Sequence, residues 1–180
     1  MTASGDYAPV DYAEVLPGIA REIEAYAAAS GWDQPSRLFA LVDTEQLLVV
    51  QPELAEALAD GRALALTPIE QEPVAGTELE ELLAGITWPD RVAGAAAVVE
   101  RVVLPPEADA DVPDDPELAR SWAQEHPDRQ EVRLVAAVAR GGSAYCALRM
   151  RAHDDPTSVV TGPDLVPALV AMLHATFEEE

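Results

Sequence analysis

Residues 130–152, QEVRLVAAVARGGSAYCALRMRA, decide the fold that we expect for this chain. Two stretches rich in apolar and β-branched residues, 130–140 and 143–152, flank the pair Gly141-Gly142. Apolar runs of this length on either side of a short glycine-containing turn are typical of a β-hairpin. We therefore predict two antiparallel strands here, and the pairing of their residues can be worked out from the sequence.

The register follows from apolar residues that recur at every second position, because such residues share one face of a strand. They are Val132, Leu134, Ala136 and Val138 in the first strand and Ala144, Cys146, Leu148 and Met150 in the second. All these positions are even-numbered, whereas a two-residue loop would pair odd with even positions and send one set to the wrong face. We therefore predict a three-residue loop, 140–142, with Gly142 in the left-handed region and Ala139 facing Ser143.

This register places Arg133 directly across from Arg149, with Arg151 and Glu131 on the same face. Like charges in facing positions destabilise a sheet by up to about 1 kcal/mol unless something compensates them. One interpretation is an anion-binding site, since a guanidinium offers a planar fork of donors to carboxylate or phosphate. The alternative is neutralisation by acidic groups of the same chain. A ligand site should leave at least two of these arginines without a carboxylate from the chain itself.

Acidic residues outnumber basic ones by 33 to 11, and lysine is absent. Five of the eleven arginines lie in residues 129–152 beside a single acid, so that window carries +4 and the rest of the chain −26. Nucleic-acid binding requires arrays of basic side chains that displace counterions, and an anionic membrane surface repels an acidic protein. We therefore expect neither nucleic acid nor a membrane as a partner.

Several classes of chemistry lack the residues they need. Without lysine there is no P-loop lysine and no Schiff base, and no glycine-rich dinucleotide fingerprint is present. Cys146 is the only cysteine, which excludes an internal disulfide and a cysteine-based zinc site. We expect it to be a small buried hydrophobe and expect no cofactor. The start resembles no signal peptide and no apolar run is long enough to span a bilayer, so we expect a cytoplasmic protein.

The rest of the chain predicts helices and strands around the hairpin. Residues 1–9 are expected to be flexible, and a helix begins at Asp11, which forms a capping box with Glu14. Pro17 should interrupt or restart that helix, and Gly31 should end it. Further helices are expected at 45–50, 52–59, 78–83 and 117–125, and a last one is opened by Pro163.

Strands are expected at 37–43, 62–69 and 92–104, in addition to the hairpin. The last of these is apolar on both faces in its first half, which indicates a central position, and Gly94 with its neighbouring alanines implies a closely packed neighbour. We therefore predict an α+β fold in one domain, residues 10–180. It would have two layers: a mostly antiparallel five-stranded sheet and helices packed on one face.

His153 and Asp155 follow the last strand and are a candidate for a metal site. Such a site needs three or four converging ligands, and the chain has only three histidines. Asp154-Asp155-Pro156 is also ordinary turn chemistry. A turn is the simpler interpretation of this segment.

Several segments resemble a family of small acidic actinobacterial proteins with no assigned function. They are LFALVDT (38–44), LTPIEQE (66–72), WPDRVAGAAAVVERVVLPP (88–106), HPDRQEVRLVAAV (126–138), ALRMRAHDD (147–155) and GPDLVPAL (162–169). The resemblance runs from about residue 36 to about residue 174 and implies a cytoplasmic actinobacterial protein, without supplying catalytic residues. Separately, the order of elements is similar to that of type III secretion chaperones, which are acidic, usually dimeric and hold partner chains.

We therefore expect a non-enzymatic interaction, adaptor or chaperone-like protein that binds a protein partner and forms a homodimer. The alternative is a small-molecule binder or enzyme that recognises an anionic ligand through Arg133, Arg149 and Arg151. No catalytic residue can be named from the sequence.

Overall fold

The computed structural model describes residues 12–54, 65–72 and 78–178. Its helices are α1 (Tyr12–Ala29), α2 (Thr44–Val50), α4 (Leu79–Gly85), α5 (Pro116–Glu125) and α6 (Pro167–Ala175). Its strands are β1 (Arg37–Asp43), β2 (Leu66–Glu70), β3 (Val92–Val103), β4 (Gln130–Ala139), β5 (Ala144–Met150) and β6 (Val160–Gly162). The short 3-10 segments are η1 (Pro52–Leu54), η2 (Pro106–Asp111), η3 (Arg151–His153) and η4 (Pro156–Ser158). The predicted flexible N-terminus, the capping box and most of the helix expected at 52–59 lie outside the described residues.

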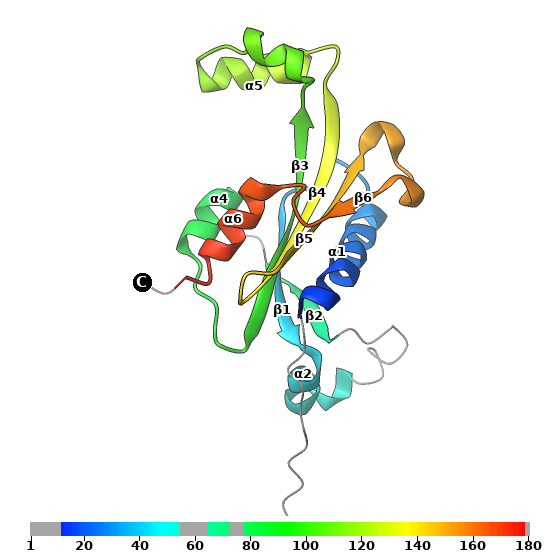
Figure 1. The fold of residues 1–180 in the computed structure, drawn as a ribbon, viewed down its shortest axis with the longest axis vertical. Helices are drawn as coiled ribbons and strands as arrows, with labels where there is room; N and C mark the ends of the chain where they lie inside the picture. The colour runs from blue at the N-terminus through cyan, green and yellow to red at the C-terminus, as the bar shows by residue number, and fades with distance from the viewer. Residues whose placement is uncertain (1–11, 55–64, 73–77, 179–180) are drawn as a thin grey trace, which may run out of the picture.

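The strands form one antiparallel sheet in the order β2-β1-β3-β4-β5-β6, which confirms the α+β class (Figure 1). The sheet has six strands rather than the five expected, because the short strand β6 pairs with β5. A three-residue strand has too little sequence for a detectable period. The expectation that Pro163 opens the last helix is wrong. Pro163 directly follows β6, which the sequence did not reveal, and Pro167 occupies the first turn of α6.

Helices pack on both faces of the sheet, so the expected two-layer arrangement is corrected to three layers. Helix α1 covers one face, and α4 and α6 cover the other (Figure 1). The reason lies in β3 and β4, whose central residues are buried on both sides, so that each face needs its own cover. The hairpin face that carries the arginines is therefore beneath α1 instead of open to solvent.

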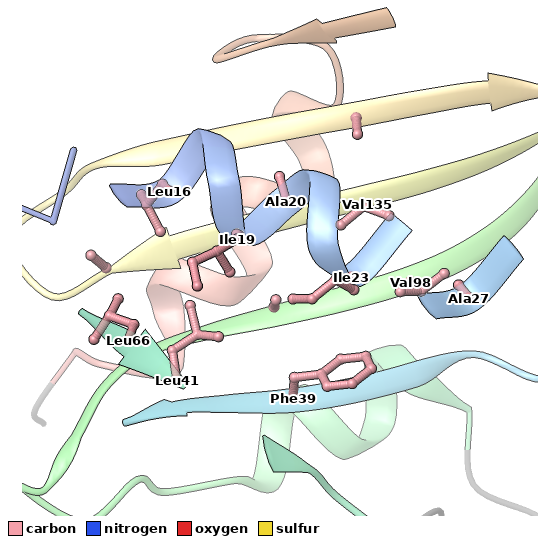
Figure 2. Close-up of a cluster of buried hydrophobic side chains, with 14 residues drawn as sticks. Leu16, Ile19, Ala20, Ile23, Ala27, Phe39, Leu41, Leu66, Val98 and Val135 are labelled. Atoms are coloured by element: carbon pink, nitrogen blue, oxygen red, sulfur yellow. The ribbon is translucent and has the colours of Figure 1, made fainter. Parts of the chain in front are cut away.

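Helix α1 contributes one regular apolar stripe to the first layer. Leu16, Ile19 and Ile23 are buried against residues of β1, β3 and β4, as Figure 2 shows. The helix runs through Pro17 without a break, contrary to the expected interruption. Buried contacts on either side of the proline stabilise the helix, because most helical stability in proteins comes from packing of an apolar face.

Two backbone details of the sheet agree with the expectations from sequence. Gly94 in β3 is buried, and a Cβ there would collide with the carbonyl oxygen of Val138, so β3 and its neighbour approach as closely as expected. In the hairpin, Ala139 N–H donates to the carbonyl of Ser143 at 3.0 Å. Gly141 and Gly142 have φ values of +99° and +103°, a region that favours glycine. The three-residue loop and the register are thereby confirmed.

The distal ends of β3 and β4 extend beyond β1 and β5, and together with the segment that joins them they form an arm, residues 102–131. In this arm β3 pairs with β4 up to Val103 opposite Gln130, whereas the β1–β3 register begins only at Arg37 opposite Val98. Figure 1 shows α5 at the far end of the arm, away from α1, α4 and α6.

None of the helices in the described part of the chain combines the length and apolar character that a bilayer crossing demands.

Candidate functional site

The hairpin arginines lie where the register predicts. Arg133 of β4 and Arg149 of β5 are direct cross-strand partners. Their exposed fractions are only 1% and 5%, so two like charges face each other in the interior. Arg151, in η3, lies at the exposed edge of the same group, with its side chain 39% exposed. We call these three arginines and the surrounding carboxylates Glu24, Asp33, Glu100, Glu131 and Asp154 the arginine cluster.

Glu24 of α1 is the acid at the centre of the arginine cluster, and it is 3% exposed. Its Oε2 accepts a hydrogen bond of 2.9 Å from Arg149 Nη2, and its Oε1 lies 2.6 Å from Arg149 Nε in an ion pair without hydrogen-bond geometry. The same Oε1 is 3.8 Å from Arg133 Nη1. One carboxylate therefore serves both buried guanidinium groups, which offsets much of their mutual repulsion.

The turn after α1 closes over Arg133. Arg133 Nη2 donates to the carbonyl of Gly31 at 2.6 Å, and its guanidinium lies 4.3 Å from the ring centre of Trp32. Gly31 has a φ of +80° and follows the end of α1, where a glycine allows the chain to turn. The guanidinium group is thus held between a carbonyl oxygen, an aromatic face and a carboxylate.

Glu100 of β3 fixes the same turn from the other side. It lies opposite Arg133 in the β3–β4 register, and its two carboxylate oxygens accept the backbone N–H groups of Asp33 at 2.8 Å and Gln34 at 2.6 Å. Charge-assisted hydrogen bonds of this kind are stronger than neutral ones. The 31–34 turn is therefore attached to the sheet at both Arg133 and Glu100.

Arg149 and Arg151 also have acidic partners that lie nearer the surface. Arg149 Nη1 lies 3.0 Å from Asp154, and Arg151 pairs with Asp33 at 2.9 Å and Glu131 at 3.2 Å. The hydrogen bond from Arg149 holds the pKa of Asp154 below its usual value, and the hydrogen bond from Arg151 does the same for the pKa of Asp33. Both carboxyl groups stay ionised in mildly acidic solution.

Each of Arg133, Arg149 and Arg151 therefore has a carboxylate partner from its own chain. An open anion site would have left at least two of them without one, so the geometry favours internal neutralisation. The arginine cluster joins α1, its following turn and three strands, and its chemistry is that of a structural clamp. Sequence reasoning missed Glu24, Trp32 and Glu100 because nothing in their local spacing points to the hairpin.

His153 and Asp155 are exposed and lie in consecutive short turns. Asp155 accepts hydrogen bonds from the backbone N–H and the hydroxyl of Thr157, both at 2.8 Å, and the N–H bond holds its pKa below its usual value. In the described ranges, no group of three histidine, cysteine or acidic side chains could hold a metal ion. The segment has the geometry of the turn that was the simpler interpretation.

A fourth hairpin arginine, Arg140, lines a cleft of about 750 Å³ between α4 and α6. Its Nε donates to the carbonyl of Val92 at 2.7 Å and its Nη2 to that of Pro89 at 3.0 Å. Its guanidinium lies 4.8 Å from the ring centre of Phe177. In the part of the chain that is described, no carboxylate pairs with Arg140.

The arm carries a second candidate surface of a different kind. Helix α5 is amphipathic: Leu118, Ala119, Trp122 and Ala123 share one side, and none of its residues is buried. Leu118 is 62% exposed, and it lies one turn from the half-buried Trp122. Val103 and Val112, elsewhere on the arm, are 47% and 40% exposed. In this stripe Leu118 is exposed and the other three residues are half-buried, and a partly exposed apolar surface on a projecting element can serve as a contact for another molecule.

Comparison with known proteins identifies the family. A family model described as PPA1309-like protein matches residues 16–178, so the chain belongs to this uncharacterised family. No curated protein matches the chain, and no solved structure matches it.

Proposed function

We propose that this protein is a non-enzymatic, chaperone-like interaction protein that holds a partner chain on its arm. The observation that carries this proposal is α5, an amphipathic helix with no buried residue at the end of the projecting β3–β4 pair (Figure 1). An isolated helix of ten residues is marginal in water, and packing of its apolar face supplies most of the stability of a helix in a protein. A partner seated on Leu118 and Trp122 would supply that packing.

The chemistry of the described residues supports a binding role over catalysis. The three arginines of the cluster are neutralised within the chain, and the Cys146 thiol is buried with its pKa raised by desolvation. A nucleophilic cysteine needs the opposite setting, exposed and electropositive. The apolar side of α5 remains partly exposed, with Leu118 62% exposed, and is therefore available to a partner.

The order of the main elements also supports the proposal. If the additions α2, α4 and β6 are set aside, the chain runs helix, three strands, helix, two strands, helix, as in type III secretion chaperones. A likeness of order is fold-level analogy and does not by itself assign function. With it we propose a cytoplasmic, actinobacterial protein that forms a homodimer, which sedimentation would distinguish from the 19.2 kDa monomer.

The proposed function is tested by affinity purification from the native host, with the tagged wild-type protein and the tagged Leu118→Asp variant compared as baits. The substitution places a charge on the exposed stripe, and its effect on stability should stay within about 0.5 kcal/mol because the side chain is on the surface. We expect the tagged wild-type protein to retain a specific partner that the Leu118→Asp variant loses, while the two melt at the same temperature.

Val49→Asp is the matched control, because Val49 is 83% exposed on α2 and lies outside the arm. It should retain the partner. If Leu118→Asp and Val49→Asp retain the same proteins as the wild type, the arm is not the docking element and the proposed function fails.

A second candidate function is binding of a carboxylate ligand in the cleft of Arg140. The favouring observation is that three backbone carbonyls and Phe177 orient the guanidinium group, while Asp90 and Glu178, which also line the cleft, form no ion pair with it. Calorimetric titration with citrate tests this function. Arg140→Lys keeps the charge but loses the planar fork of donors, so it should weaken the binding of citrate. If the wild-type protein shows no heat of citrate binding, the site is ruled out.

A further inference from the structure

We propose that the partner segment held by the arm is a cationic amphipathic helix, with apolar residues on one side and lysine or arginine on the other. This inference rests on the proposed function and specifies the chemistry of the partner. It combines two observations on the same part of the molecule: a partly exposed apolar stripe, and acidic side chains without ion-pair partners among the residues that the structure describes.

The negative charge is concentrated at the tip of the arm. Residues 105–129 contain eight acids and two arginines, a net charge of −6. Glu107, Asp111, Asp114 and Glu117 are exposed, and none of them forms an ion pair with the residues that the structure describes. In the arginine cluster, by contrast, each arginine has a carboxylate partner. The tip therefore presents a field that attracts cations and repels anions.

The apolar stripe lies within this acidic segment. Leu118 follows Glu117 directly, and Val112 lies between Asp111 and Asp114, so apolar and acidic side chains alternate along the tip. A helix that lays an apolar face against such a stripe brings its flanking residues close to the carboxylates. Charge complementarity then favours basic flanking residues, as in other helix-in-groove complexes with amphipathic partners.

The same charge disfavours a second copy of this chain at the arm. Two arms meeting at their tips would bring together two segments that each carry −6. Like-charge juxtaposition across an interface costs several kcal/mol. A basic partner gains from the charge that a second copy would have to overcome.

The experiment uses the full chain and a synthetic amphipathic peptide of about 18 residues, with leucines on one face and lysines on the other. Fluorescence anisotropy of the labelled peptide measures its affinity. We expect binding that weakens at least tenfold when NaCl rises from about 0.05 to about 0.5 M, because salt screens the attraction. Leu118→Asp, which removes the apolar contact, should also weaken it about tenfold. A scrambled peptide of the same composition should bind weakly.

Matched charge variants separate the arm from the acidity of the whole chain. The arm variant is Glu107→Gln/Asp111→Asn/Asp114→Asn. The control variant, Glu14→Gln/Glu53→Gln/Glu81→Gln, removes three exposed carboxylates elsewhere, so the two proteins have equal net charge. The arm variant should bind the peptide at least fivefold more weakly than the control variant. Equal weakening by both variants, or no effect of Leu118→Asp, overturns the inference.

Failure of this inference is distinguishable from failure of the proposed function. If the native partner is lost from Leu118→Asp but its binding is insensitive to salt and to the arm charge variant, the arm docks a partner that is not cationic. If sedimentation shows a wild-type dimer that Leu118→Asp dissociates, the occupant is a second copy and the inference is wrong. If Leu118→Asp changes neither the partner set nor peptide binding, both proposals fail.

Discussion

Arg133 and Arg149 occupy directly opposite positions on β4 and β5, and both are buried. Facing like charges normally destabilise a sheet. Here Glu24 of α1 forms ion pairs with both arginines, and Asp154 forms a second ion pair with Arg149. Two positive charges are therefore matched by two carboxylates. The position of α1 on the sheet is thereby tied to the charge balance of the hairpin.

Removing the central carboxylate should therefore destabilise the protein strongly. Glu24→Gln keeps the shape of the side chain but leaves two buried guanidinium groups short of one negative charge, which should lower the free energy of unfolding by about 3 kcal/mol. Urea unfolding measures it. Glu14→Gln, an exposed change on the same helix, is the control and should stay within about 0.5 kcal/mol of the wild type. Equal stabilities of the two variants would refute the clamp.

The close approach of β3 to its neighbour predicts an intolerant glycine. In Gly94→Ala the new methyl group collides with backbone atoms of Val138 and Ala139, which cannot move aside as a flexible side chain would. We expect a loss of about 3 kcal/mol in urea unfolding, in the range of overpacked cores. Gly85→Ala is the matched substitution, because a methyl group there would meet no other atom within 4 Å. A Gly94→Ala protein as stable as Gly85→Ala would contradict the observed strand spacing.

The depressed pKa values of Asp33 and Asp154 predict acid sensitivity. Arginine hydrogen bonds lower both pKa values in the folded protein below the usual value of an aspartate, so folding favours the ionised form. The stability that these groups contribute is complete above the unfolded-state pKa and is lost as pH falls through the folded-state pKa. Urea unfolding at about pH 6, 4 and 3 should show this decline. Asp154→Asn should flatten it, and an unchanged pH profile would show that the Arg149–Asp154 pair contributes nothing.

Cys146 should be unreactive in the folded protein. Its side chain is fully buried, and burial raises the pKa of the thiol, so little thiolate is available to a reagent. At about pH 8, labelling by a disulfide reagent should be at least about 100-fold slower in the native protein than in guanidinium chloride. Labelling at the same rate in both states would mean that the β5 face is accessible. Mass spectrometry of the labelled protein gives the readout.

Features with a local pattern could be predicted from the sequence. A two-residue apolar period predicts the hairpin loop and the pairing of Arg133 with Arg149. Apolar residues on both faces of β3 predict its central place in the sheet. These patterns are short in range, because adjacent strands of a hairpin constrain each other through neighbouring residues. Pro17 shows the limit of such rules, since packing of α1 on the sheet overrides a local helix-breaking preference.

The amino-acid order alone determined which arginines share a face and that their charges need compensation. Only the tertiary structure decided what compensates them, because the partner Glu24 lies on a helix remote in the chain, and docking of α1 on the sheet brings it there. The same is true of the second covered face and of β6, whose pairing depends on β5 and not on its own three residues. Contacts between distant segments are set by how whole elements pack, and no local spacing encodes that packing.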